Sequence, residues 1–123
     1  MTTLRAFCLA VFALLPMAAL AETFLLMAEQ KGCAWCERWD REIAPIYDKT
    51  AEGAAAPLRR YDIHEDDLKD VTLASRVSFT PTFILVRDGQ EVSRIEGYPG
   101  EDFFWGLLER MLEEARIPLD DTG

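Results

Sequence analysis

The chain is poor in the residues and patterns on which several common kinds of function depend. Its 123 residues contain one histidine and three cysteines, so a zinc or haem site with several ligands would be hard to assemble. It has 22 acidic but only 13 basic residues, and the net charge of −9 argues against a domain that neutralises nucleic-acid phosphates. No glycine-rich phosphate loop is present. At this length, with 50% of its residues hydrophobic, the chain suits one ordinary globular domain.

The longest apolar run lies at the N-terminus and is too short to span a bilayer. Ala6 to Leu20 is a stretch of 15 residues without charge, whereas a membrane-spanning helix needs about 20 residues. The run follows Arg5, and Ala19-Leu20-Ala21 has the small-x-small form after which signal peptidase cleaves. We therefore predict that residues 1–21 are a cleavable export signal, in preference to a retained membrane anchor, and that residues 22–123 form the mature domain.

Removal of this segment would leave an acidic chain with only two cysteines. Residues 1–21 contain one of the 13 basic residues and none of the acidic ones, so the mature chain would carry a net charge of −10. Cys8 would be lost, which leaves Cys33 and Cys36 as the only thiols. An exported protein meets an oxidising compartment, in which disulfides form and persist. We therefore predict a periplasmic protein with one dithiol–disulfide pair and no membrane anchor after cleavage.

The hydrophobic periodicity of the mature chain predicts a strand–helix–strand–helix–strand–strand–helix order. The first strand–helix–strand unit is expected to pair in parallel, and the Asp88-Gly89 pair predicts a tight turn between two antiparallel strands. We therefore predict an α/β fold, with a mixed central sheet of about four strands flanked by helices on both faces. The expected elements are a strand over Thr23–Ala28, a helix from Ala34 that Pro45 bends or disrupts, a strand over Leu58–Ile63, a short helix over Asp66–Ser75, strands over Thr82–Val86 and Glu91–Ile95, and a last helix that Asp102 caps.

The two remaining cysteines lie in the sequence Cys33-Ala34-Trp35-Cys36, where the first strand is predicted to lead into a helix. The unpaired N–H groups at the start of a helix favour a thiolate, which lowers the pKa of Cys33 and makes it a nucleophile for disulfide exchange. Cys36 follows one helical turn later and is expected to be less exposed, so that it attacks the mixed disulfide and releases the partner. The alternatives are a purely structural disulfide, a weak copper or zinc site completed by His64, and a cysteine-protease pair of Cys33 with His64.

A second candidate element, Thr80-Pro81, directly precedes a predicted strand. A proline is awkward inside a central strand but suits a tight entry through a cis peptide bond, whereas a trans proline that starts the strand is the alternative. A cis bond would leave the backbone of Thr80 free to pair with an extended segment of a partner. We therefore predict that Thr80 and Pro81 bind the substrate, and that apolar surface around Trp35, Pro81 and Tyr98 completes the contact area.

Together these residues resemble the thioredoxin superfamily. Cys33-Ala34-Trp35-Cys36 at the head of a helix matches its CxxC motif, and Thr80-Pro81-Thr82 matches its cis-proline segment. The Asp88-Gly89 turn and the following Gly97 are also placed as in that family. The resemblance implies a thioredoxin-like fold and a thiol–disulfide oxidoreductase that needs neither a metal nor an organic cofactor.

Two segments, Gly32–Ile43 and Glu96–Trp105, resemble more narrowly the periplasmic thioredoxin-like proteins of bacterial sulfur-oxidation systems. That resemblance implies a monomer that reduces disulfides or blocked cysteines of a sulfur-carrier protein complex and is recharged by a membrane electron donor of the thiol–disulfide type. An oxidase or isomerase of the same fold is one alternative, and a non-catalytic regulatory or metal-binding module is another. We expect partners with protein thiols or disulfides, and no nucleic acid.

The sequence departs from the usual thioredoxin pattern at two places. Thioredoxins typically carry Gly-Pro between the cysteines, where this chain has Ala34-Trp35. They also bury an aspartate on the strand before the motif, whereas Phe24–Met27 contains no acid and Glu29 is expected in the loop that follows. The reduction potential and the route of the proton therefore do not follow from the resemblance.

Overall fold

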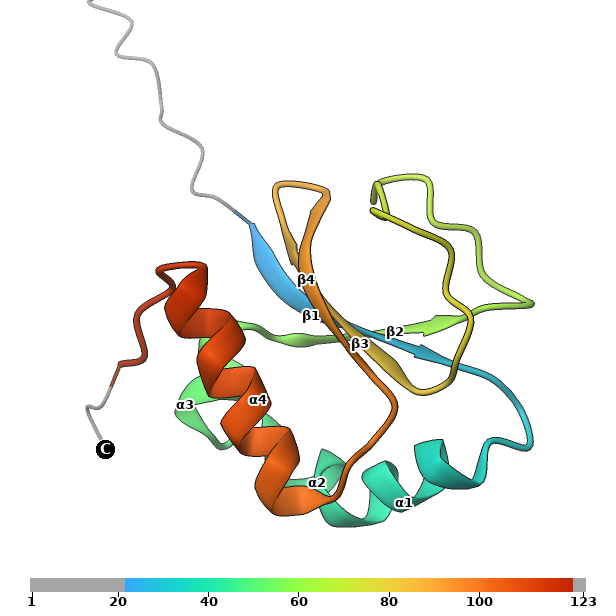
Figure 1. Ribbon diagram of the computed structural model, residues 1–123, viewed down its shortest axis with the longest axis horizontal. Coiled ribbons are helices and arrows are strands. Elements are labelled where there is room, and N and C mark those ends of the chain that lie inside the picture. Colours follow the sequence, from blue (N-terminus) through green and yellow to red (C-terminus); the bar gives the residue numbers. More distant parts are fainter. Residues whose placement is uncertain (1–21, 121–123) are drawn as a thin grey trace, which may run out of the picture.

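A computed structural model describes residues 22–120 of the chain, and the predicted export signal over residues 1–21 lies outside this part (Figure 1). The elements follow the predicted order with two differences: the helix expected over Asp66–Ser75 is absent, and a short helix over Ala51–Ala55 is present that the sequence did not predict. They are β1 (Thr23–Glu29), α1 (Ala34–Glu42), α2 (Ala44–Tyr47), α3 (Ala51–Ala55), β2 (Leu58–Asp62), β3 (Thr82–Arg87), β4 (Gln90–Glu96) and α4 (Glu101–Glu114).

The four strands form one mixed sheet in the order β2-β1-β3-β4. β1 pairs in parallel with β2 and antiparallel with β3, and β3 pairs antiparallel with β4. The two central strands, β1 and β3, are buried along most of their length, which explains why they appear in the sequence as continuous apolar runs. Asp88 and Gly89 form the turn between β3 and β4 with φ angles of 51° and 76°, as a two-residue hairpin turn requires. The predicted hairpin and the mixed four-stranded sheet are confirmed.

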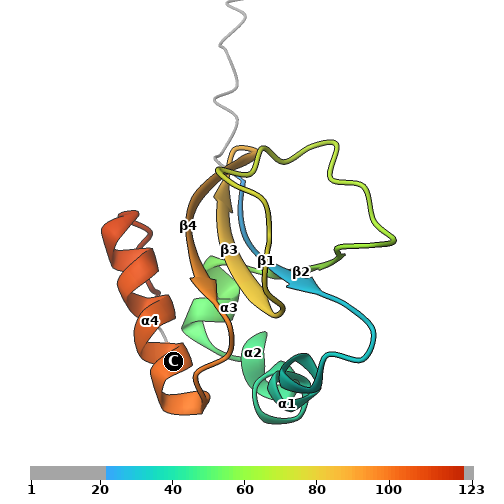
Figure 2. The ribbon, with the colours of Figure 1, turned by 45° about the vertical axis from the view of Figure 1, so that its right-hand side comes forward.

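The two faces of the sheet are covered differently. In the part of the chain that the structure describes, all the helices pack on one face, and the irregular segment 63–81 covers the other (Figures 1 and 2). The predicted helix over Asp66–Ser75 is therefore wrong, and so is the expectation of helices on both faces. The cause is tertiary: the N–H of Thr72 donates to the carbonyl of Gly89 at 2.7 Å, and the carbonyl of Thr72 accepts from Glu91 at 3.0 Å. These bonds hold the middle of the segment against the hairpin as an isolated bridge.

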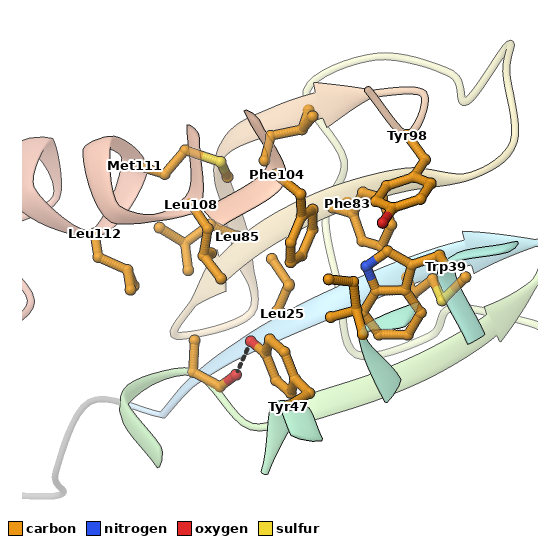
Figure 3. Packing of buried hydrophobic residues seen from close by; sticks show 14 of the residues in the cluster. Leu25, Trp39, Tyr47, Phe83, Leu85, Tyr98, Phe104, Leu108, Met111 and Leu112 are labelled. Atoms are coloured by element: carbon orange, nitrogen blue, oxygen red, sulfur yellow. Dashed lines mark hydrogen bonds between the residues drawn. The ribbon is translucent and has the colours of Figure 1, made fainter. Parts of the chain in front are cut away.

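The main core lies between the sheet and the helices and is centred on Trp39 (Figure 3). The Trp39 ring centroid lies 5.2 Å from that of Phe83 and 5.8 Å from that of Phe104, and aromatic pairs at such distances add about 0.5–1.5 kcal/mol each beyond burial. Because Trp39 lies one helical turn after Cys36, this packing anchors α1 and with it the cysteine pair. The largest fully buried side chains are Trp39, Tyr47, Phe83, Phe104, Leu25, Leu26, Met27, Ile43, Ile84, Leu85, Leu108 and Leu112.

Two helix boundaries show the influence of single residues. α1 ends at Glu42 and Pro45 lies in the first turn of α2, so the predicted disruption by Pro45 is confirmed. α4 begins at Glu101 after Gly100, whose φ of 99° suits glycine, so the prediction that Asp102 caps this helix is wrong. Asp102 lies inside the first turn instead, where its negative charge faces the positive end of the helix dipole.

Candidate active site

The two cysteines form a disulfide at the start of α1. Gly32, with a φ of 76°, turns the chain from β1, and Cys33 then caps the helix: the N–H of Cys36 donates to the Cys33 sulfur at 3.1 Å. Cys33 is half-buried, whereas Cys36 is only 4% exposed. A sulfur that already accepts a helix N–H is well placed to carry negative charge after reduction. The expected difference in exposure between the cysteines is therefore present.

A cleft of about 320 Å³ opens beside the disulfide and is rich in carboxylates. Arg60 donates to Glu29 and to Asp40, both at 2.7 Å, and so joins the end of β1 to α1 across the cleft wall. Glu29 is the last residue of β1, so its expected place in the loop is wrong. The lining residues are Glu29, Gln30, Lys31, Gly32, Cys33, Cys36, Glu37, Asp40 and Asp62.

Thr80, which is half-buried, lies in the segment directly before Pro81 and β3. The Thr80–Pro81 peptide bond is cis. The Pro81 carbonyl accepts from the N–H of Gly97 at 2.7 Å, and the Thr82 hydroxyl donates to the carbonyl of Phe79 at 2.7 Å. These bonds secure the residues on both sides of Thr80, but within residues 22–120 no protein group hydrogen-bonds the backbone N–H or carbonyl of Thr80 itself. That backbone is free to pair with another chain.

The apolar surface near the cysteines differs from the expected one. Trp35 is 55% exposed, and the Arg38 guanidinium lies 5.4 Å from its ring centroid. Pro81 and Tyr98, in contrast, are buried, so the expectation that they contribute exposed apolar surface is wrong. The Tyr98 ring packs on the core at 6.1 Å from Phe104, and burial, with the nearby Glu42 carboxylate, raises the Tyr98 pKa to about 12.

One polar contact at the site was not predicted from the sequence. Gln30 lines the cleft beside the cysteines and donates through Nε2 to the Thr80 hydroxyl at 2.7 Å. Its Oε1 atom lies 2.9 Å from Nε2 of His64. Gln30 thus connects the cysteine loop with the segment before β3, although these are far apart in sequence. Its only signal in the sequence is a polar side chain three residues before Cys33.

His64 contacts Gln30 but does not itself line the cleft beside the cysteines. It is exposed and lines a separate cavity with Tyr61 and Arg76. Among the described residues no group of three or more histidine, cysteine or acidic side chains is placed to hold a metal ion. The geometry therefore favours neither the protease pair nor the metal site weighed from the sequence.

The two cysteines close a disulfide across one helical turn, and a mixed sheet of the order β2-β1-β3-β4 supports them. These features define a thiol–disulfide oxidoreductase of the thioredoxin-like class. The comparison with protein families agrees: the chain belongs to the thioredoxin-like domain family, whose model matches residues 17–112.

Among solved structures, the chain is similar to the periplasmic thioredoxin SoxS from Paracoccus pantotrophus in its reduced form, with 51% identity and a TM-score of 0.74 over 76% of this chain and 99% of SoxS. This similarity confirms the narrower resemblance seen in the sequence. Two more distant structures share the fold. Thioredoxin-2 of the malaria parasite is 17% identical, with a TM-score of 0.54 over 76% of this chain and 86% of that one. Fasciola hepatica thioredoxin is 20% identical, with a TM-score of 0.54 over 72% of this chain and 80% of that one. Within residues 22–120, no helix is both long and apolar enough to cross a membrane.

Proposed function

We propose that this chain is a periplasmic reductant of protein disulfides, with Cys33 as the attacking and Cys36 as the resolving cysteine. The observation that carries the proposal is the asymmetry of the pair: Cys33 is half-buried at the helix start, and Cys36 is buried behind it. The proposed location rests on the predicted export signal over residues 1–21 and on the similarity to a periplasmic thioredoxin.

The chemistry balances as two successive disulfide exchanges. In the reduced protein the Cys33 thiolate attacks one sulfur of the partner disulfide, forms a mixed disulfide and expels the other sulfur as a thiolate, which takes up a proton. Cys36 then loses its proton and attacks the Cys33 sulfur, which expels the second partner sulfur. The partner gains two electrons and two protons, and the protein ends with the Cys33–Cys36 disulfide seen in the structure. The reaction needs no metal or organic cofactor.

Trp35, Thr80 and Pro81 are the proposed substrate-binding residues. An extended partner segment can hydrogen-bond the free backbone of Thr80, in the manner of a strand added to an edge. Pro81 contributes through its place in the backbone, because its ring is buried and its carbonyl is held by Gly97. The exposed ring of Trp35 offers apolar contact beside the cysteines.

The proposed partners are the carrier complex of a sulfur-oxidation system as substrate and a membrane thiol–disulfide protein as electron donor. The support for both is the similarity to SoxS. In the native host, a Cys36→Ser variant is expected to retain its substrate as a stalled mixed disulfide, because the resolving sulfur is missing. Non-reducing electrophoresis and mass spectrometry of the captured species check this, with the Cys33→Ser/Cys36→Ser double variant as the matched control. Recovery of other proteins alone would contradict the proposed partner, and capture of none would contradict the mechanism.

The direction of electron flow is tested by the reduction potential. We expect equilibration in thiol buffers of defined ratio to give a potential more negative than the roughly −180 mV of protein disulfide isomerase, as a reductant requires. The redox state is quantified by alkylation of free thiols. A potential near −120 mV, typical of a strong oxidant, would instead support the oxidase of the same fold.

A further inference from the structure

We propose that Gln30 is a positioning residue for the disulfide-exchange reaction, which holds Thr80 in place for the partner segment. The inference rests on the proposed function, since it takes the Thr80 backbone as the partner-binding edge. The Gln30 side chain hydrogen-bonds Thr80 and His64 and neither of the two cysteine side chains.

The Gln30 amide is held at both of its polar atoms. Nε2 donates to the Thr80 hydroxyl at 2.7 Å, and Oε1 lies 2.9 Å from Nε2 of His64, which acts as the donor because the amide oxygen can only accept. Because the two contacts lie on opposite atoms of the amide, they hold the side chain between Thr80 and His64. The side chain is half-buried in the wall of the cleft that also contains Cys33 and Cys36.

The two partners of Gln30 are the two ends of the irregular segment 63–81. His64 is the second residue after the end of β2, and Thr80 is the second residue before the start of β3. The turn after β2 is hydrogen-bonded: the Asp62 carboxylate accepts from the N–H groups of His64 and Glu65 at 2.9 and 3.1 Å, and the bond from His64 lowers the Asp62 pKa. One amide from the cysteine loop therefore connects the opposite end of the segment to this turn.

Gln30 restrains Thr80 at a point where, within the described residues, the backbone N–H and carbonyl of Thr80 form no hydrogen bond with another protein group. Beside the bonds that hold Phe79 and Pro81, the bond from Gln30 to the side chain is the restraint on Thr80 itself. Loss of the bond is expected to weaken the docking of an extended partner segment and to leave the reactivity of the Cys33 sulfur unchanged.

The test compares two probes of the reduced protein. Insulin presents disulfides in a polypeptide, whereas 5,5′-dithiobis(2-nitrobenzoate) is a small disulfide that does not need the Thr80 backbone. We expect Gln30→Met, which keeps the length of the side chain but not its hydrogen bonds, to slow the reaction with insulin about three- to tenfold, the loss of about one hydrogen bond. The rate with the small disulfide and the reduction potential should not change.

Three further substitutions test whether the slower reduction of insulin arises through Thr80. Thr80→Val and Gln30→Met should together slow insulin reduction no more than the stronger single change, because both remove the same bond. His64→Leu should give a smaller loss with the same dependence on the probe. Glu65→Gln is the matched control: it breaks the 2.7 Å ion pair with Lys31, which joins the same two loops, and should leave both rates unchanged.

The outcomes separate this inference from the proposed function. Equal slowing with both probes, no slowing with either, or losses that multiply in the double variant would overturn the positioning role of Gln30. Failure of the unaltered reduced protein to reduce insulin would instead count against the proposed function itself.

Discussion

A reduced Cys36→Ser protein is expected to release one equivalent of thiolate from 5,5′-dithiobis(2-nitrobenzoate) and then stop, whereas the unaltered protein releases two. The first equivalent comes from attack by Cys33, whose sulfur is half-buried at the helix start. The second requires Cys36 to attack the mixed disulfide, and the disulfide in the structure shows that the two sulfurs can meet. The absorbance of the released thiolate gives the count, and the intact mass of the protein gives the stalled adduct.

The converse variant, Cys33→Ser, is expected to react with the same reagent at least about 10³-fold more slowly, because the thiol that remains is buried and lacks the helix-terminal position. Its unfolded form, measured in denaturant, should react at the rate of an ordinary thiol and so provides the control for a chemically intact Cys36. A folded Cys33→Ser protein that reacts as fast as the unaltered one would reverse the assigned roles.

Gly53→Ala is expected to lower the free energy of unfolding by about 1–3 kcal/mol, the usual cost of overpacking. Helix propensity alone predicts a higher free energy of unfolding instead, since alanine is favoured over glycine by about 1 kcal/mol inside a helix. The cause is that a Cβ at position 53 would overlap the backbone carbonyl of Tyr47, which cannot move aside as a side chain can. The surroundings are also bonded: the Thr50 hydroxyl accepts from Gly53 N–H at 3.0 Å and donates to the Tyr47 carbonyl at 2.6 Å.

Gly106→Ala provides the matched control for this prediction. Gly106 is exposed in α4, and a Cβ there would meet no atom within 4 Å. We therefore expect it to raise the free energy of unfolding by about 0.5–1 kcal/mol. Urea titrations of the unaltered protein and of both variants, with the disulfide intact, measure the change in the free energy of unfolding that each substitution causes. A Gly53→Ala protein as stable as Gly106→Ala would contradict the overlap at Tyr47.

The local parts of the site could be predicted from the sequence because they depend on neighbours along the chain. A cysteine that follows a strand and precedes a helix caps that helix, and its partner three residues later lies one turn away. The Asp88-Gly89 turn is likewise local, since two residues with positive φ are enough to define it.

Two of the wrong predictions have a tertiary cause, one through backbone hydrogen bonds and the other through side-chain packing. Leu68, Val71 and Leu73 suggested a helix, but Thr72 between them bonds to the hairpin, and Val71 packs on the second face of the sheet in an irregular segment. Tyr98, which follows the last strand, was expected to add apolar surface near the cysteines. Its ring instead packs in the aromatic core against Phe104. Neither outcome is visible in a local pattern of hydrophobic residues.

The sequence by itself determined the order of the strands, the hairpin and the cysteine pair, because strand periodicity, turn preferences and the three-residue cysteine spacing all act between near neighbours. Only the tertiary structure decided that the segment 63–81 is irregular, and that Gln30 meets Thr80 and His64. These depend on how β1, α1 and the segment 63–81 pack together, and contacts between residues 34 to 50 positions apart are set by the whole fold.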